Sequence, residues 1–109
     1  MVKQFKVLVL ERDLDTLSKI YLTLVHRNFK AEASDNPLEL EGRLKRFKPA
    51  LLIIGREALE GIQATVRLPM IVIESTAPAS SSNVDGDVRF LYKPVTADKL
   101  MQLVEQLLI

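Results

Sequence analysis

The chain has 109 residues, 48% of them hydrophobic, which predicts one compact domain over residues 1–109 with a substantial core. Its 15 basic and 14 acidic residues leave a formal net charge of +1, too small to recruit nucleic acid or an anionic membrane. The absence of cysteine excludes disulfides, thiolate metal sites and cysteine nucleophiles, and it is most natural in a reducing cytosol.

The first predicted strand is a continuous apolar run, Val7–Leu10, that ends at the charged Glu11. Such a run is typical of an inner strand of a parallel sheet, because both of its faces are covered. The helix that follows can be capped by Asp13 or Asp15. It carries apolar residues at the i, i+3, i+4, i+7, i+8 spacing of one helical face, and these are Leu17, Ile20, Tyr21, Leu24 and Val25.

A short, weakly alternating segment over residues 29–33 predicts an edge strand. The next helix has a clear start, with Asn36 as N-cap, Pro37 at the first helical position and Glu39 at the third. It runs to about residue 47 and is expected to bury Leu40, Leu44 and Phe47.

The chain is organised around Leu51–Ile54, four large apolar residues in a row. This segment is predicted to be a central strand buried on both faces. In a parallel sheet, functional groups lie just past the carboxyl ends of the strands, and here that position is Gly55. Because glycine has no side chain, it can contribute only backbone to a site at this end of the sheet.

After the central strand we expect a brief helix, interrupted by Gly61, with its apolar positions at Leu59, Ile62 and Val66. A third buried run over residues 69–73 predicts the fourth strand, which ends at Glu74. Residues 75–87 have no apolar period, so we expect a loop there with at most one turn of helix.

An alternating segment over residues 88–92 predicts an outer strand, and Lys93-Pro94 ends it. Thr96 can cap a final helix. That helix has a strong apolar stripe, formed by Leu100, Leu103, Val104, Leu107 and Leu108.

Strands that alternate with helices predict an α/β fold, a three-layer sandwich built on a parallel sheet. The five strands fit the flavodoxin-like order 2-1-3-4-5, because the two short, polar strands, the second and the fifth, become its edges. The lack of an apolar period after the fourth strand predicts that the fourth helix is shortened or missing.

This succession of segments resembles the receiver domain of two-component response regulators over nearly the whole chain. The segments that carry the resemblance are residues 7–10 followed by acids, residues 48–54, residues 69–73 and residues 90–95. Its most specific element is Lys93-Pro94 at the end of the fifth strand, before an amphipathic last helix. The resemblance implies bacterial phosphorelay signal transduction, with paired acids that bind magnesium, an acceptor aspartate, a Ser or Thr and an aromatic switch residue.

The residues expected to carry that chemistry differ at most positions. Gly55 stands where the resemblance places the acceptor aspartate after the third strand. Arg12 occupies one of the two paired-acid positions, beside Glu11, and Glu74 replaces the Ser or Thr after the fourth strand. These four residues and Lys93 therefore form a degenerate phosphorylation site.

Lys93-Pro94 and the aromatic residue Phe90 do fit the receiver pattern. Without a phosphoryl group, the Lys93 ammonium still needs an anion, because an unpaired and partly buried charge is costly. We expect it to pair with Glu74 or Glu11, with Arg12 either in the vacant cation position or turned to solvent.

Phosphoryl transfer needs a nucleophile, a hard cation and donors for the phosphoryl oxygens. Gly55 provides no nucleophile, Arg12 replaces a cation ligand with a positive charge, and Glu74 would repel phosphate. We therefore interpret the sequence as a pseudo-receiver that lacks the acceptor aspartate, has no enzymatic activity and needs no cofactor or metal.

The expected partner is another signalling protein or an output domain, bound through the fifth strand and the last helix; homodimer formation is left open. No signal peptide pattern or membrane-length apolar run is present, so we expect a cytoplasmic protein without membrane or nucleic-acid contacts. The alternative is a small-ligand or nucleotide-binding flavodoxin-like domain that uses the carboxyl ends of its strands. Another enzyme class would need a Ser/His pair or matched carboxylates, and neither is visible.

Overall fold

The computed structural model describes residues 4–60, 67–75 and 87–108. Five parallel strands form one sheet in the order β2-β1-β3-β4-β5, which confirms the predicted fold class and strand order. The strands are β1 (Lys6–Leu10), β2 (Lys30–Ser34), β3 (Leu51–Gly55), β4 (Met70–Glu74) and β5 (Val88–Tyr92). The helices are α1 (Leu14–His26), α2 (Leu40–Phe47), α3 (Arg56–Glu60) and α4 (Ala97–Leu108), and a 3₁₀ turn, η1 (Pro37–Glu39), precedes α2.

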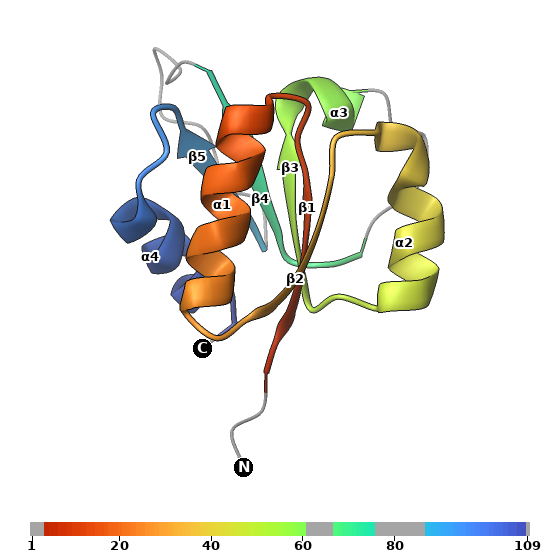
Figure 1. Cartoon of the computed structure of the whole chain (residues 1–109), viewed down its shortest axis with the longest axis horizontal. Coiled ribbons are helices and arrows are strands. Elements are labelled where there is room, and N and C mark those ends of the chain that lie inside the picture. The colour runs from red at the N-terminus through yellow and green to blue at the C-terminus, as the bar shows by residue number, and fades with distance from the viewer. Residues whose placement is uncertain (1–3, 61–66, 76–86, 109) are drawn as a thin grey trace.

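Helices cover both faces of the sheet, so the molecule has three layers (Figure 1). α1 and α4 lie on one face, and α2 and α3 lie on the other. Since successive side chains of a strand point to opposite faces, β1 contributes to two separate cores. Val7 and Val9 pack in the cluster beneath α1 and α4, whereas Leu8 and Leu10 pack in the cluster beneath α2 and α3.

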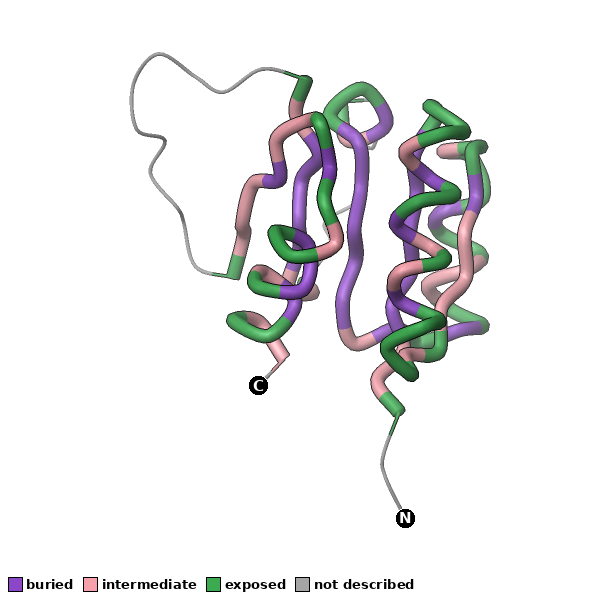
Figure 2. The backbone as a smooth tube through the Cα atoms, turned by 60° about the vertical axis from the view of Figure 1, so that its left-hand side comes forward, coloured by how far each residue is buried: buried purple, intermediate pink, exposed green. Residues whose placement is uncertain are grey.

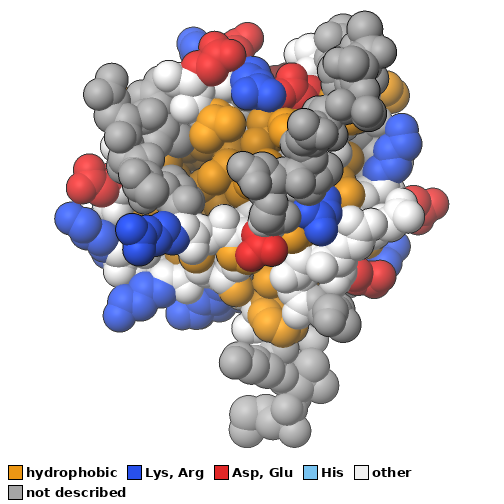
Figure 3. All heavy atoms as spheres, turned by 180° about the vertical axis from the view of Figure 1, so that it is seen from behind, with side chains coloured by type: hydrophobic (Ala, Val, Ile, Leu, Met, Phe, Trp, Pro, Cys, Tyr) orange, Lys and Arg blue, Asp and Glu red, His pale blue; other side chains and the backbone are white. Residues whose placement is uncertain are grey.

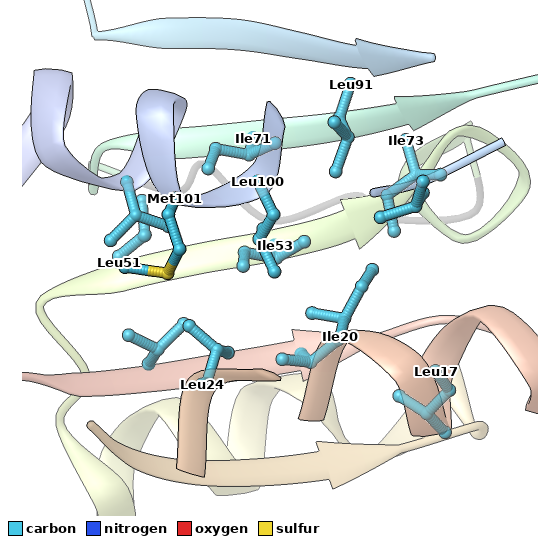
Figure 4. Packing of buried hydrophobic residues seen from close by; sticks show 14 residues of the cluster. Leu17, Ile20, Leu24, Leu51, Ile53, Ile71, Ile73, Leu91, Leu100 and Met101 are labelled. Carbon is cyan, nitrogen blue, oxygen red and sulfur yellow. The ribbon is translucent and has the colours of Figure 1, made fainter. Parts of the chain in front are cut away.

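β3 is the most deeply buried strand, and all five of its residues are buried (Figure 2). In the core beneath α1 and α4, Ile20 and Leu100 reach toward Ile53, and Met101 lies near Leu51 (Figure 4). Truncation of such a side chain to alanine typically costs about 2–5 kcal/mol. The central strand therefore fixes the position of Gly55, its last residue.

Two of the predicted helix starts are confirmed by their hydrogen bonds. Oδ1 of Asn36 accepts from the amide of Leu38 (3.0 Å), although the first turn is the 3₁₀ turn η1 and α2 follows it. Oγ1 of Thr96 accepts from the amide of Lys99 (3.3 Å), in the first turn of α4. Asp13 precedes α1, but its carboxylate accepts from the hydroxyl of Thr16 (2.6 Å) instead of a backbone amide.

Two sequence predictions need correction. Val25, predicted on the buried face of α1, is 42% exposed, because the sheet is reached only by a narrower stripe formed by Leu17, Ile20 and Leu24. The second strand spans Lys30–Ser34 instead of residues 29–33, since its register is set by pairing with β1.

The helix predicted after β3 is described only as far as Glu60, so its expected apolar positions at residues 62 and 66 lie outside the described residues. The loop and the shortened or missing helix predicted between β4 and β5 fall mostly on residues 76–86, which likewise lie outside the described residues. Among the described residues, no helix combines the length and apolar character needed to cross a membrane.

Candidate functional site

The carboxyl ends of the parallel strands meet at one edge of the sheet and surround a small cavity of about 100 Å³. Four of the predicted site residues line it, and these are Glu11, Arg12, Gly55 and Lys93. The other two lie further along the sheet: Glu74 ends β4, and Phe90 is on β5, where it packs against the core beneath α2 and α3. The structure thus brings most of the predicted set together.

The carboxylate of Glu11 is folded inward over the end of β3. Glu11 is only 7% exposed, and a Cβ atom added to Gly55 would overlap its Oε2 atom. The position of this carboxylate therefore depends on the missing side chain at residue 55. In effect, Glu11 fills the volume that a residue larger than glycine would use.

Lys93 holds two carboxylates at this edge. Its Nζ atom lies 3.6 Å from Oε1 of Glu11 and 3.3 Å from Oδ2 of Asp13. The amide of Asp13 also donates to Oε1 of Glu11 (3.4 Å), so the three residues form one connected cluster. The expected pair between Lys93 and Glu11 is confirmed, and Asp13 is a second partner of the same ammonium.

Burial raises the pKa of Glu11 above its usual value, although the amide of Asp13 and the Lys93 ammonium pull in the opposite direction. The ion pair does not compensate for the removal of this carboxylate from water. The pKa of Asp13 is lowered, first by the hydrogen bond from Thr16 and then by Lys93. Glu11, the buried acid, is thus harder to ionise than an ordinary glutamate, and Asp13, the exposed acid, is easier to ionise than an ordinary aspartate.

The carboxylate of Glu74 binds Arg56 instead of Lys93. Nε of Arg56 donates to Oε1 of Glu74 (2.6 Å), and a second guanidinium nitrogen contacts the same oxygen. The guanidinium carbon also lies 5.9 Å from the centre of the Phe90 ring, within cation–π range. Arg56 therefore joins the ends of β3 and β4 to the aromatic residue of β5. Sequence reasoning missed this role, although Arg56 directly follows Gly55.

Arg12 points outward. Its side chain is 65% exposed and its guanidinium lies 3.8 Å from the carboxylate of Glu57, which is exposed as well. Exposed pairs of this kind contribute about 0–1 kcal/mol at most. Of the two orientations expected for Arg12, the one turned to solvent is found.

The receiver pattern implies a bound magnesium ion, and the residues present do not fit one. A magnesium site needs oxygen ligands that are free to coordinate the ion. Here Gly55 offers no side chain, Arg12 points away, and the carboxylates of Glu11 and Asp13 both face the Lys93 ammonium. The part of the chain that the structure describes has no cluster of three or more His, Asp or Glu side chains suited to a metal ion.

No protein-family model and no curated protein matches the sequence. Solved structures do match over nearly its whole length. The response regulator signal receiver domain from Bermanella marisrubri gives a TM-score of 0.72 at 17% identity, over 98% of this chain and 100% of that one. The chemotaxis response regulator CheY4 of Vibrio cholerae gives 0.72 at 11% identity, over 97% and 100%. The chain has the fold of a response regulator receiver domain.

The same receiver fold is found within a longer protein, NtrX from Brucella abortus, which was solved in complex with ATP. That match has a TM-score of 0.76 at 18% identity and covers 97% of this chain but 27% of NtrX. Identities this low show a common fold, and a fold of this kind serves many functions. The function has to be argued from the residues at the strand ends.

Proposed function

We propose that the chain is a receiver-like signalling domain that does not accept phosphate and acts by binding another protein, independently of phosphorylation. One observation carries this proposal: the Glu11 carboxylate fills the space above Gly55, where the receiver pattern has the acceptor aspartate. With no nucleophile at residue 55 and an acid in its place, an incoming phosphoryl group finds neither an acceptor nor an empty anion site.

The partners of Lys93 support the same conclusion. In the receiver pattern a lysine at this position contacts the phosphoryl group, whereas here its ammonium is already held by Glu11 and Asp13. The internal carboxylates thus supply the negative charge that phosphorylation would bring. A domain built in this way keeps one arrangement of its strand ends.

Arg56 adds a second fixed link. It binds Glu74, which stands where the receiver pattern has a Ser or Thr, and it lies over the ring of Phe90. The aromatic residue of β5 is therefore held from within the domain, without a phosphoryl group. Neither link involves a catalytic step, and we propose that the domain is not an enzyme.

A surface for the partner lies at β5 and α4. A groove of about 180 Å³ runs between them, lined by Phe90, Leu91, Tyr92, Lys99, Gln102 and Leu103. Seen from behind, the molecule shows a group of hydrophobic side chains near the centre of the view (Figure 3). A mostly apolar groove with a lysine at its edge fits an apolar segment that carries an acidic residue.

The alternative, a small-ligand or nucleotide-binding domain, has less support. The cavity at the strand ends has a volume of about 100 Å³, and ligand pockets typically have volumes of about 300–1,000 Å³. Thermal unfolding with a panel of nucleotides checks this alternative, because a ligand that binds the folded state raises the melting temperature.

The proposed function is tested by quantitative capture of proteins from a lysate of the native cells. The bait is the wild-type chain, the groove variant Lys99→Glu, or the matched control Lys45→Glu on the exposed side of α2. A partner is expected with the wild type and the control, in equal amount with and without acetyl phosphate and magnesium, and it should be lost with Lys99→Glu. Capture that requires acetyl phosphate would contradict the proposal.

A further inference from the structure

β2 is an edge strand that leaves two residues with outward-pointing backbone groups. Among the described strands, β2 pairs only with β1. The amide of Lys30 donates to the carbonyl of Phe5 (3.0 Å), and the carbonyl of Ser34 accepts from the amide of Glu11 (3.1 Å). The N–H and C=O groups of neighbouring strand residues point to opposite sides. Those of Ala31 and Ala33 therefore point away from β1, along the open edge.

The helix beside this edge has an exposed apolar side. Leu14, Leu22 and Val25 of α1 are 59%, 51% and 42% exposed. The polar side of α1, with Thr16 and Lys19, lines the groove toward the start of α4. At 3.6 residues per turn, Leu14 and Val25 lie on the flank away from Thr16 and Lys19, whereas Leu22 lies between this flank and the polar side. One side of the molecule thus combines an unpaired strand edge with an apolar helix flank (Figure 1).

We propose that a second copy of this chain binds here, with β2 antiparallel to the partner's β2 about a two-fold axis beside Glu32. In this register Ala31 lies opposite the partner's Ala33, and Ala33 lies opposite the partner's Ala31. Both are hydrogen-bonded pairs, in which opposite residues exchange their N–H and C=O groups. The outward backbone groups of both copies are then satisfied, and the contact is closed, as two-fold symmetry requires.

The geometry of α1 fits this arrangement. α1 lies over β1 and β2, and it contacts both strands (Figure 4). If its axis lies midway between them, the two-fold axis separates the two α1 helices by about 10 Å, twice the strand spacing of about 4.8 Å. Packed helices are typically about 8–10 Å apart. The small side chains of Ala31 and Ala33 on this face leave room for the apolar flanks to meet.

The charges on the other face favour a second copy as the occupant. Glu32 would meet the partner's Glu32. The Arg43 guanidinium lies 3.0 Å from Glu32 and is shared with Glu39 (2.8 Å), so each group of three side chains keeps a net negative charge. The exposed Lys30 comes diagonal to the partner's Glu32 and opposite the partner's Ser34, whose hydroxyl donates to its own Glu39. Lys30 of each copy therefore offsets the negative charge that the partner's Glu32 brings to the axis.

Sedimentation of the purified chain over a concentration series up to about 1 mM tests the pairing, since contacts of modest area associate weakly. The wild type should shift from monomer to dimer. Ala33→Pro should stay monomeric at every concentration, because it removes an outward N–H group and leaves the bonds to β1 intact. The matched variant Ala33→Ser keeps that N–H group and should dimerise like the wild type.

The helix flank is tested in the same series. Val25→Lys should weaken the dimer at least tenfold, because it places a charge between the two α1 helices. Lys19→Glu, on the polar side of α1, should leave the dimerisation constant unchanged.

Hydrogen exchange of the wild type decides the case even if a variant fails to fold. The amides of Ala31 and Ala33 should exchange fast in dilute solution and at least tenfold more slowly at high concentration, with no such change for β5. A chain that stays monomeric throughout would overturn the inference, and so would a dimer in which these two amides remain fast. The inference does not depend on the proposed function.

Discussion

The carboxylate of Glu11 occupies the volume that a side chain on Gly55 would need. The two residues lie at the ends of neighbouring strands, β1 and β3, so the absence of a side chain at one position determines where the other side chain can fold. The same carboxylate then meets the ammonium of Lys93.

Substitution of Gly55 by alanine should destabilise the protein by about 1 kcal/mol, the lower end of the usual cost of overpacking, because the overlapping atom is the end of a flexible side chain. The added Cβ would overlap Oε2 of Glu11 and push this carboxylate away from Lys93. Denaturant unfolding of Gly55→Ala, Glu11→Ala and the double variant measures the coupling between the two sites. Because Glu11→Ala removes the clash, the Gly55 substitution should cost much less in that background; equal costs in both backgrounds would contradict the described contact.

Removal of the Lys93 ammonium should destabilise the protein by more than about 1 kcal/mol, the upper end for exposed ion pairs. Lys93→Met leaves the buried carboxylate of Glu11 without its cation. The midpoint of denaturant unfolding should fall at unchanged slope. The matched control is Lys45→Met, which removes an exposed pair with Glu41 and should change stability very little. If both variants unfold at the wild-type midpoint, Lys93 is only a solvated surface residue.

Stability should depend on pH through Glu11, with a sign that follows from burial. The pKa of Glu11 is raised above its usual 4.5, so the folded state binds more protons than the unfolded state in the window above 4.5. The free energy of unfolding therefore falls as pH rises through this window. Compared with Glu11→Gln, the wild type should lose stability between pH 4.5 and the raised pKa, as measured by denaturant unfolding at a series of pH values.

Asp13 should act in the opposite sense and at lower pH. The pKa of Asp13 is lowered below the usual 3.8. Its contribution to the free energy of unfolding is therefore present above pH 3.8 and is lost as the pH falls through the lowered pKa. The Asp13→Asn variant should therefore be less sensitive than the wild type to acid below about pH 3.8. The Glu11 prediction has the opposite sign. If the wild type instead gained stability relative to Glu11→Gln as the pH rises above 4.5, the assignment to Glu11 would be contradicted.

Most of the fold was predictable because hydrophobic patterns dictate it. The uninterrupted apolar runs of β1, β3 and β4 are typical of inner strands, and the cap residues Asn36 and Thr96 mark helix starts by their own hydrogen bonds. The exposure of Val25 was not predictable, because its spacing fits the buried stripe of α1 and only the position of the sheet shows where that stripe ends.

The site was predictable to the level of which residues meet, because the ends of parallel strands converge. The choice among partners was not. Lys93 could reach either Glu11 or Glu74, and the structure gives Glu74 to Arg56, whose long side chain crosses from α3 to β4. The inward fold of Glu11 also depends on empty space at Gly55, a feature that a one-dimensional pattern does not express.

The most direct test of the central claim is the intact mass of the wild-type protein after incubation with acetyl phosphate and magnesium. A receiver domain that has the acceptor aspartate serves as the positive control in the same reaction. We predict that the control gains one phosphoryl group and that this chain keeps its mass, because Gly55 has no group to modify and Glu11 and Lys93 already neutralise each other. A phosphoryl adduct on a residue at the strand ends, located by peptide mass mapping, would contradict the account.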